Sequence, residues 1–318
     1  MQTSLSTVVS TRTLVTQYQT ALDGVYDTMR GGSLALALDD LFTDLSLRRE
    51  EEPDSWSEFA AACRRHPLCR LLHQDPFTYR AFSKPRGYAG DAVMMDYIYG
   101  LGDAGRAAHR ATPMGRAIFT HMGTRPSARA VRYRRELLAS LIDRTASRGG
   151  SRVFALAAGH LREVEVSRAI RERAVRDFVA MDQDDESLAV VRRDHAGLGI
   201  TAVNGSVRQI LGKKVNAGSF DFVYAAGLFD YLTAPVATAL TSRLFEMTRP
   251  GGTLLIPNFA AGAPDSGYME AFMDWHLIYR THDEMRALAE TLPAGRIANV
   301  DVFDDEDATI TFLLVEKH

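Results

Sequence analysis

The spacing of apolar residues changes once along the chain, near residue 149. Before that point apolar residues recur at the i, i+4, i+7 and i+11 spacing of one helical face, as in Leu34, Leu38, Leu41 and Leu45. Prolines divide this region into short helices, at Pro67, Pro76, Pro85 and Pro113. Residues 1–126 are therefore predicted to form an all-helical amino-terminal domain, and a basic amphipathic helix over 127–146 leads into a second domain.

After Gly149 short apolar runs replace the helical spacing. Seven of them predict strands, at 152–158, 177–182, 200–204, 220–227, 252–259, 297–303 and 308–316. Helical stretches separate the first five, at 161–173, 185–195, 206–211 and 233–248. Strands that alternate with helices pair in parallel through right-handed crossovers, so residues 127–318 are predicted to form an α/β, doubly wound, Rossmann-like domain.

The end of the second domain departs from this alternation. Only the acidic tetrapeptide at 304–307 separates the last two predicted strands, which is short enough for a hairpin. We therefore expect a mostly parallel seven-stranded sheet with one antiparallel edge strand. Ligands bind such sheets beyond the carboxyl ends of the strands, where the strand order reverses. The loops after the first four strands are the candidate site.

The loop after the first strand contains a single glycine. It runs from Ala157 to Glu163, and only Gly159 lets the backbone approach a ligand without a side chain in the way. A dinucleotide needs several bare amides at a helix start to hold its diphosphate. The loop therefore argues against a pyrophosphate-binding turn, and a cofactor without phosphate places less demand on it.

The second and third strands end in polar residues. Asp182, followed by Gln183, stands where a carboxylate can accept hydrogen bonds from both hydroxyls of a ribose. Gly205 and Ser206 follow the third strand and either present a backbone amide and a hydroxyl to an adenine edge or form a plain turn. These four residues are candidate cofactor ligands.

The loop after the fourth strand combines small and aromatic residues. Ala226 and Gly227 are followed by Phe229 and Tyr231. A flat and partly cationic group can lie against a strand end of this kind. The Pro250 turn before the fifth strand is expected to have a structural role.

Charge and cysteine content limit the classes of partner. The net charge of -3 argues against a general nucleic-acid binder, because binding to a phosphate backbone needs an excess of Lys and Arg. Arg132, Arg134 and Arg135 are interpreted as a solvated helix face. The two cysteines, Cys63 and Cys69, are too few for a zinc site, so no metal is expected. Thiols of this kind suit a reducing, cytoplasmic compartment.

The amino terminus lacks a basic patch followed by an apolar run, so it is not read as a signal peptide. Nowhere does an apolar run reach the length of a membrane span. We therefore expect a cytoplasmic protein with a small-molecule substrate, and a homodimer is left open.

Several segments resemble known methyltransferases. FDFVY (220–224), TRPGGTLLI (248–256) and the acidic end of the second strand resemble the class I S-adenosylmethionine-dependent methyltransferase pattern over about residues 131–318. KPRGYAGD (84–91), AGLFDYL (226–232) and DWHLIYR (274–280) resemble a narrower bacterial group. That group includes the methyltransferase that makes the quorum signal 3-hydroxypalmitic acid methyl ester. The first loop departs from the group's glycine-richer GSGPARE, with only Gly159, Arg162 and Glu163 matching.

The resemblance implies S-adenosylmethionine as cofactor, with S-adenosylhomocysteine as product. It also assigns further roles to residues of both domains. The residues it implies for cofactor binding are Arg86, Tyr88, Ala157, Gly159, Glu163, Asp182, Gln183, Gly205, Ser206, Ala226 and Gly227. Those it implies for the substrate are Lys84, Met95, Phe229 and Arg280, and the candidate general bases are His276, Tyr231 and Tyr279. The helical domain is expected to act as a lid that excludes water.

The acceptor does not follow from the resemblance. O-methylation of a carboxylate, on a fatty-acid-like or specialised metabolite, is the first choice, because a carboxylate is ionised at neutral pH and needs no base. An N-, C- or hydroxyl O-methyltransferase is the alternative within the same class. A cofactor-binding protein without catalysis and a NAD-dependent dehydrogenase stay open as other classes, although a dehydrogenase predicts a fuller glycine turn.

Overall fold

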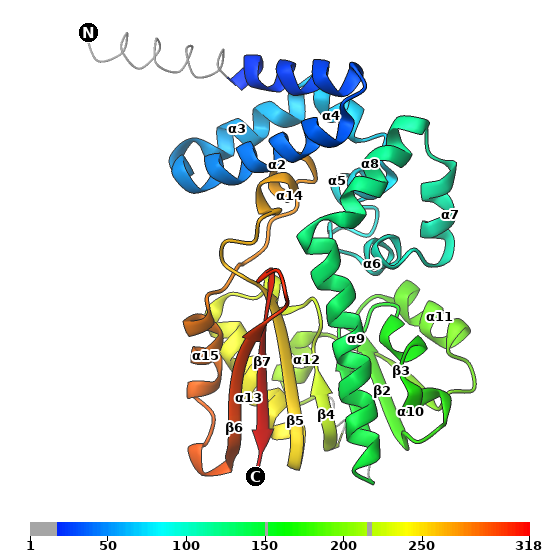
Figure 1. The fold of residues 1–318 in the computed structure, drawn as a ribbon. Helices are drawn as coiled ribbons and strands as arrows, with labels where there is room; N and C mark the ends of the chain where they lie inside the picture. Colours follow the sequence, from blue (N-terminus) through cyan, green and yellow to red (C-terminus); the bar gives the residue numbers. More distant parts are fainter. Residues whose placement is uncertain (1–17, 150–151, 215–217) are drawn as a thin grey trace. The chain divides into compact units, whose positions relative to one another are not determined.

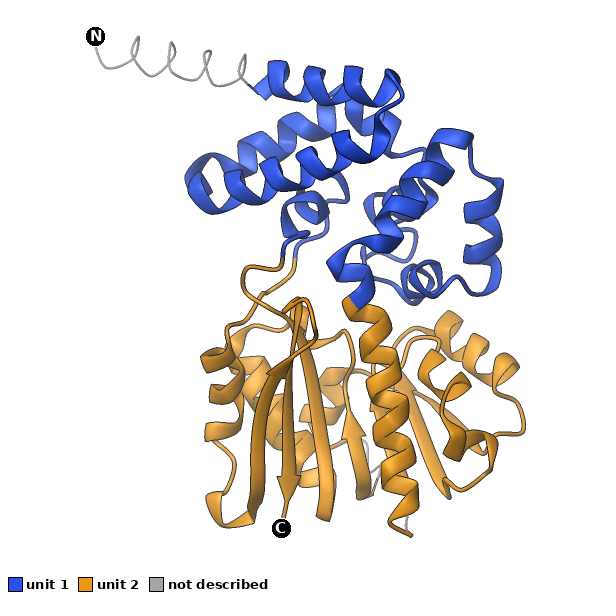
Figure 2. Cartoon of the chain, in the orientation of Figure 1, with its two compact units in different colours: residues 1–129, 264–276 blue, residues 130–263, 277–318 orange. Residues whose placement is uncertain are grey.

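The computed structural model describes residues 18–149, 152–214 and 218–318. The chain folds into two compact units (Figure 2). The first, the helical unit, comprises Met1–Arg129 and Pro264–His276, and the second, the sheet unit, comprises Ala130–Ala263 and Leu277–His318. The interpretation of the amino terminus concerns residues that lie largely outside the described part.

The helical unit consists of short helices in an order that the prolines punctuate (Figure 1). After helical residues 18–30 come α2 (Leu34–Glu51), α3 (Pro53–Arg65), α4 (Pro67–Leu72), α5 (Pro76–Ser83), α6 (Ala92–Tyr99), α7 (Gly102–Arg110) and α8 (Pro113–Thr124). Proline stands at the first position of α3, α4, α5 and α8, where its missing N–H costs nothing. On α2 most of the predicted apolar face is confirmed, since Leu38, Leu41 and Leu45 are buried, while Leu34 at the first position of the helix is half-buried.

A segment from far along the chain completes this unit. Pro264–His276 carries α14 (Ser266–Phe272), which packs against α2 and α3. A side chain at Gly267 would lie 2.7 Å from the carbonyl oxygen of Leu45, so only glycine allows this approach. The buried carboxylate of Glu270 accepts hydrogen bonds from Trp56 Nε1 at 2.6 Å and from Arg49 Nε at 3.0 Å. Charge pairing as well as burial thus holds the segment in place.

The sheet unit contains one seven-stranded sheet, in agreement with the predicted fold class. Its strands are β1 (Arg152–Leu156), β2 (Asp177–Asp182), β3 (Ile200–Asn204), β4 (Phe220–Tyr224), β5 (Thr248–Phe259), β6 (Ile297–Asp304) and β7 (Ile310–Lys317). Their order is β3-β2-β1-β4-β5-β7-β6. The first five strands pair in parallel, and β7 runs antiparallel between β5 and the edge strand β6.

Helices cover both faces of the sheet (Figure 1). On one face α12 (Val207–Leu211), α13 (Ala234–Met247) and α15 (His282–Glu290) pack onto an apolar cluster that includes Phe220, Leu244 and Met285. The other face carries α9 (Pro126–Ser147), which begins in the helical unit and continues in the sheet unit. The remaining connections are α11 (Asp185–Asp194) and the short η1 (Arg162–Glu165), α10 (Arg168–Arg171), η2 (Phe229–Tyr231) and η3 (Ala294–Arg296).

The predicted helix over 161–173 is wrong as a single element. Leu161 adopts a left-handed conformation with φ of 54°, and η1 ends before Ser167. The Ser167 hydroxyl then caps α10 by accepting from the backbone of Ile170, and it donates to the Asp143 carboxylate. Local capping thus outweighs a helical apolar pattern in this stretch.

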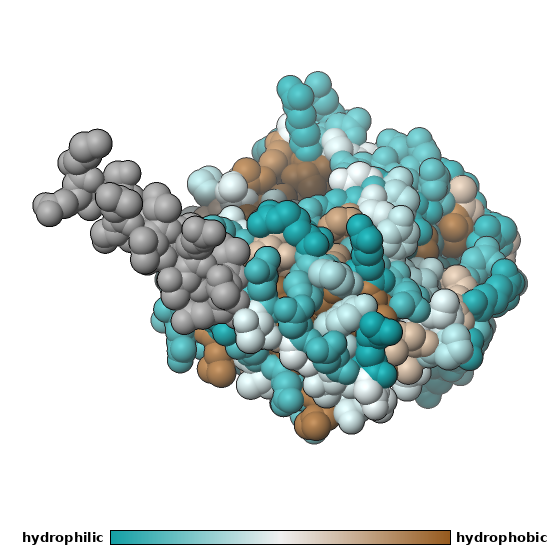
Figure 3. Space-filling view, turned by 90° about the horizontal axis from the view of Figure 1, so that it is seen from above, coloured by the Kyte–Doolittle hydropathy of each residue, from teal (hydrophilic) through white to brown (hydrophobic). Residues whose placement is uncertain are grey.

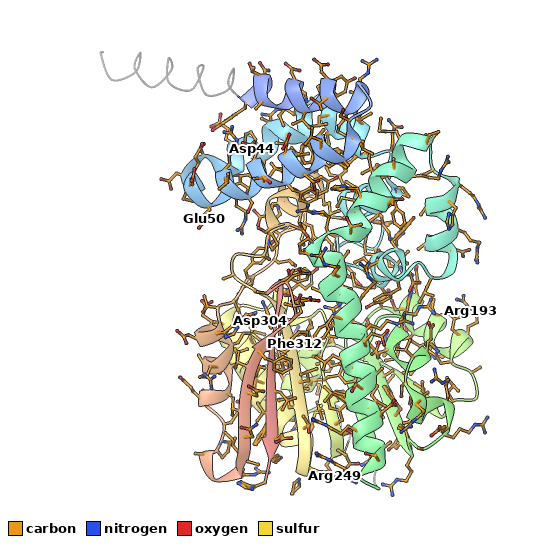
Figure 4. The ribbon with its side chains drawn as sticks, viewed as in Figure 1. Asp44, Glu50, Arg193, Arg249, Asp304 and Phe312 are labelled. Carbon is orange, nitrogen blue, oxygen red and sulfur yellow. The ribbon has the colours of Figure 1, made fainter. Side chains whose placement is uncertain are left out.

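The acidic connection between β6 and β7 is a tight turn, as its length predicts. The buried Asp305 carboxylate accepts hydrogen bonds from the backbone of Asp307, Thr309 and Ile310. Figure 4 labels Asp304 at the end of β6 and Phe312 on β7, near this turn. A single side chain therefore satisfies the donors that the reversal of the chain leaves open.

The surface seen in Figure 3 is mostly hydrophilic, with hydrophobic patches between the polar groups. Among the described residues no helix is both long enough and apolar enough to cross a membrane. Cys63 and Cys69 are both buried free thiols.

We expect Glu270→Ala to destabilise the helical unit by about 2–3 kcal/mol, because Trp56 and Arg49 lose a buried acceptor. Urea unfolding followed by tryptophan fluorescence measures this unit alone, since both tryptophans, Trp56 and Trp275, belong to it. Glu50→Ala, at an exposed position of α2 (Figure 4), is the matched control and should change little. Equal loss in the two variants would contradict the anchoring role of Glu270.

Candidate active site

The candidate site lies in the sheet unit, at the carboxyl ends of β1, β2, β3 and β4. The strand order reverses between β1 and β4, which are neighbours in the sheet although β2 and β3 separate them in the sequence. Loops on the two sides of such a point diverge and leave room for a ligand. The predicted loop residues of the sheet unit therefore share one edge.

Asp182, the last residue of β2, joins three of these loops. Its Oδ2 accepts a hydrogen bond from Gly159 N at 2.8 Å, and its Oδ1 accepts one from Asp184 N at 2.9 Å. Its backbone carbonyl accepts from Gly205 N at 2.9 Å. Burial raises the pKa of the Asp182 carboxyl, and the two backbone donors counteract part of that effect. Asp182 is 8% exposed.

The first loop has an unusual backbone for its sequence. Ala157, Gly159 and Leu161 all adopt left-handed conformations with φ of 54°. Glycine accepts this conformation freely, whereas each residue with a side chain pays roughly 1–2 kcal/mol for it. The loop therefore has a glycine-like backbone at Ala157 and Leu161, two positions that carry side chains.

A buried pair connects the first loop to β4. The Tyr224 hydroxyl donates a hydrogen bond of 2.5 Å to Glu163 Oε1, and both side chains are buried. Burial raises the pKa of Glu163, while the hydrogen bond from Tyr224 and the charge of Arg134 lower it in part. Glu163 was predicted as a cofactor ligand, and Tyr224 was not singled out. The pair fixes the first loop against the fourth strand.

Arg134 is a site residue that the sequence interpretation missed. It is 6% exposed, so its assignment to a solvated helix face is wrong. A methyl group at Gly227 would lie 3.7 Å from Arg134 Nη1, which places the guanidinium beside the loop after β4. Its charge acts on both Glu163 and Asp230. The helical spacing could have identified Arg134 as buried, because it lies four residues from both Ala130 and Leu138, which are buried.

The turn after β3 is built around packing and capping. A side chain at Gly205 would lie 2.9 Å from Met181 Sδ, so glycine keeps this turn close to β2. Ser206 begins α12 in a capping box with Gln209. The exposed Gln183 accepts a long hydrogen bond from Asn204 through its carbonyl. The roles of Gly205, Ser206 and Gln183 in cofactor binding stay predictions.

The loop after β4 is held by Arg280. Its guanidinium donates to the carbonyl oxygen of Phe229 at 2.8 Å, to that of Leu232 at 2.5 Å, and to the Asn258 side chain. Arg280 is buried, and burial lowers its pKa. Its contacts support the η2 backbone, and a direct contact with substrate stays a prediction. Phe229 belongs to the apolar core, whereas Tyr231 is 39% exposed and Tyr279 half-buried.

Asp230 ties this loop to β5. Its Oδ1 accepts from Phe259 N at 2.6 Å, and its carbonyl accepts from Ile278 N at 2.7 Å. Burial raises the pKa of Asp230, and the charges of Arg134 and Arg280 oppose that rise. Asp230 is thus the third buried carboxyl at this edge, after Asp182 and Glu163.

Five of the predicted residues belong to the helical unit. They are Lys84, Arg86, Tyr88, Met95 and His276. Asp274, which was not predicted, brings two of them together: Lys84 Nζ lies 2.5 Å from Oδ2, and His276 Nε2 lies 3.2 Å from Oδ1. Burial alone would raise the pKa of the Asp274 carboxyl, but the hydrogen bonds from Lys84 and His276 lower it below its ordinary value.

The KPRGYAGD segment forms the connection between α5 and α6. Its last residue, Asp91, caps α6 by accepting from Met94 N and forms an ion pair of 2.6 Å with Arg80. Gly87 has a φ of 86°, which favours glycine. Tyr88 lies in the same turn and is 36% exposed. The segment thus has a rigid frame, and the roles of Arg86 and Tyr88 stay predictions.

We expect Tyr224→Phe to destabilise the sheet unit by about 1–3 kcal/mol near neutral pH, since Glu163 loses its buried donor. The pKa of Glu163 is already raised in the fold and rises further without the hydroxyl. Such a group stabilises the fold at low pH and loses that contribution as pH rises through its folded pKa. The loss should therefore be smaller at about pH 5 than at about pH 7.5.

Urea unfolding followed by far-ultraviolet circular dichroism at both pH values measures this difference. Adding Glu163→Gln to Tyr224→Phe removes the titrating group and should abolish the pH dependence. A loss that is the same at both pH values would show that the hydrogen bond does not involve the charge of Glu163.

Comparison with known proteins adds to this geometry. The family model described as a methyltransferase domain matches residues 164–252, which lie entirely in the sheet unit. No curated protein sequence matches the chain. A Bordetella parapertussis protein provisionally described as exported superposes with a TM-score of 0.53 at 16% identity, over 77% of this chain and 95% of that chain.

A Thermobifida fusca protein provisionally described as a methyltransferase gives a TM-score of 0.50 at 14% identity, over 71% of this chain and 94% of that chain. At this identity the likeness concerns the fold alone. The quorum-signal group suggested by the sequence is not confirmed. The domain match and the Rossmann-like sheet together support a methyltransferase enzyme with S-adenosylmethionine as its cofactor, built on the sheet unit of the chain.

Proposed function

We propose that the protein is an S-adenosylmethionine-dependent methyltransferase that acts on a small molecule, with a carboxylate oxygen as the first choice of acceptor. The observation that carries the proposal is the Asp182 carboxylate at the carboxyl end of β2, within the matched methyltransferase domain. When bound, the cofactor supplies an activated methyl group. The protein's own residues bind and orient the reactants.

The residues at this edge fit the nucleoside part of the cofactor. Each oxygen of Asp182 accepts one backbone hydrogen bond and has a second lone pair for a ribose hydroxyl. Additional hydroxyl donors would favour the ionised form that burial disfavours. The hydrogen bond from Gly159 N to Asp182 Oδ2 keeps the first loop close to β2. We place the adenine near Gly205 and Ser206, because these residues follow β3 and Gly205 N is bonded to the carbonyl of Asp182.

The methionine part of the cofactor carries a carboxylate, which requires a cation. Arg134 is a buried guanidinium beside Gly227, and guanidinium groups bind carboxylates through two parallel hydrogen bonds. Its neighbours Glu163 and Asp230 have raised pKa values because they are buried. We assign Arg134 to the cofactor carboxylate, while the roles of Arg86 and Tyr88 stay predictions from the sequence.

A carboxylate acceptor suits the basic side chains of the helical unit. Lys84 and His276 share Asp274, which orients both side chains. Because a carboxylate is ionised at neutral pH, it needs no base, and the exposed His276 then serves for binding rather than for proton removal. An amine or hydroxyl acceptor would instead use His276 as the base, with Asp274 as its partner. A screen of acids, amines and alcohols that follows S-adenosylhomocysteine formation separates the two.

We expect Asp182→Asn to weaken S-adenosylhomocysteine binding roughly tenfold to 100-fold, because hydrogen bonds to a charged acceptor are lost. Isothermal titration calorimetry measures the affinity. Asp177→Asn, at the other end of β2, is the matched control and should bind as the wild type does. Unchanged affinity in a folded Asp182→Asn variant, or binding of NAD in place of S-adenosylhomocysteine, would overturn the proposal.

Arg134→Gln tests the assignment of the carboxylate site. The variant should bind S-adenosylhomocysteine roughly tenfold more weakly, since one charge-assisted contact is lost. Its affinity for 5′-methylthioadenosine, which lacks the amino acid carboxylate, should change little. Arg132→Gln, on the same helix, is the control. An equal loss for both ligands would mean that Arg134 only supports the fold of the site.

A further inference from the structure

The helical unit contains a cavity of about 390 Å³. Its lining comes from α5, α6, α8 and the beginning of α9 (Figure 1), all within the first 129 residues of the chain. Protein interiors contain few voids larger than a water molecule, whereas ligand pockets measure about 300–1,000 Å³. The cavity therefore has the size of a ligand site, and it lies within one compact unit without a contribution from the sheet unit.

Three aromatic rings line the cavity in a row. The rings of Phe77 and Tyr97 meet edge to face with centroids 6.4 Å apart, and those of Tyr97 and Phe119 do so at 6.2 Å. Such ring pairs are favourable beyond the apolar area that they bury. Met122 adds a flexible apolar side chain whose sulfur also suits an aromatic neighbour. A further ring placed in the cavity therefore extends an arrangement that the lining already has.

The lining offers no partner of opposite charge to an ionised ligand. Among the described residues that line the cavity none carries a charge. The exposed Thr120 and Thr124 donate their hydroxyl protons to the backbone carbonyls of Arg116 and His121, at 2.9 Å and 2.7 Å. A carboxylate or an ammonium group would thus lose water without a compensating contact.

The charges nearest to the row of rings are already compensated. Burial raises the pKa of the Tyr97 phenol, which therefore stays neutral. Of the charged groups that act on it, Arg80 and Asp91 form an ion pair of 2.6 Å with each other, and Asp75 caps α5. The cavity is therefore an uncharged aromatic environment next to a satisfied polar network.

We propose that this cavity binds a small uncharged aromatic molecule of one or two rings. An apolar cavity of about 150 Å³ accommodates benzene, so about 390 Å³ has room for two fused rings. The site is additional to the candidate cofactor site, and its occupant is a separate ligand of the helical unit. Because such a ligand binds the folded unit and not the unfolded chain, it stabilises that unit against unfolding.

Two glycines of the helical unit provide a matched pair of variants. Gly123 lines the cavity from the last turn of α8, and a Cβ built on it meets no atom within 4 Å. Gly123→Leu should therefore fill part of the cavity without a clash. Gly24 is an exposed helical residue with equally open surroundings and is not among the lining residues, so Gly24→Leu is the control. Both changes replace glycine by a good helix former.

Isothermal titration calorimetry of the full-length protein compares benzyl alcohol, indan-2-ol, cyclohexylmethanol and benzoate. Indan-2-ol should bind more tightly than benzyl alcohol, because it buries more apolar area. After subtraction of their partition between water and octanol, benzyl alcohol should bind roughly twofold to tenfold more tightly than its saturated analogue. Benzoate should bind roughly tenfold more weakly than benzyl alcohol, or not at all.

The variants connect this binding to the cavity. Indan-2-ol should bind Gly123→Leu roughly tenfold more weakly than it binds the wild type, since apolar area is lost, while Gly24→Leu keeps the wild-type affinity. Indan-2-ol should also raise the urea midpoint of the helical unit in the wild type and in Gly24→Leu, but not in Gly123→Leu. The fluorescence of Trp56 and Trp275, excited at a wavelength that the ligand does not absorb, reports this unfolding.

Three results would each overturn the inference. They are the absence of binding by both aromatic alcohols, an affinity for benzoate equal to that for benzyl alcohol, and wild-type affinity for indan-2-ol in Gly123→Leu. The first two concern the wild type alone and do not depend on the folding of a variant. Binding of S-adenosylhomocysteine is measured separately, and its absence would reject the methyltransferase function without affecting the aromatic site.

Discussion

The Asp182 carboxylate determines how the loops of the sheet unit meet. One oxygen accepts a hydrogen bond from the amide of Gly159 and the other from the amide of Asp184, so the loops after β1 and β2 are held next to each other. The backbone carbonyl of the same residue holds the third loop through Gly205. Because the anchor is a side chain at a strand end, the loops take their position from the sheet rather than from their own sequence. The first loop can therefore tolerate Ala157 and Leu161 in conformations that usually require glycine.

This arrangement has an electrostatic consequence. Asp182, Glu163 and Asp230 are all buried at one edge, and burial raises the pKa of each. Uncompensated carboxylates would repel one another in a region of low dielectric constant. Arg134 and Arg280 supply opposite charge, and backbone or tyrosine donors supply hydrogen bonds. The edge is thus a polar network within a largely apolar unit, and such networks require every member to be satisfied.

The sequence predicted what depends on local pattern, and it missed what depends on distant contacts. Each of the seven apolar runs forms a strand, although β5 begins at Thr248 and includes Pro250, which was expected to lie in a turn. Pro67, Pro76 and Pro113 begin helices, whereas Pro85 lies in the connection between α5 and α6. The prediction of one helix over 161–173 was wrong because Ser167 and Ala169 form hydrogen bonds with Asp143, which lies on α9 and not in the predicted segment. Asp274 was missed because Lys84, one of its two partners, is 190 residues away in the sequence. Arg134 could have been predicted from the sequence, since it lies at the four-residue spacing of the buried residues Ala130 and Leu138 on α9.

The packing of Pro264–His276 against the first helices also determines when the helical unit can complete its folding during synthesis. The ribosome releases the amino-terminal helices long before α14 exists, so the place that Gly267 and Glu270 occupy stays unfilled while β1 to β5 are synthesised. Contacts between α2 and α14 join residues more than 200 positions apart, and closing so long a loop is slow. The helical unit, although first in the chain, therefore completes its core only after most of the sheet strands have emerged.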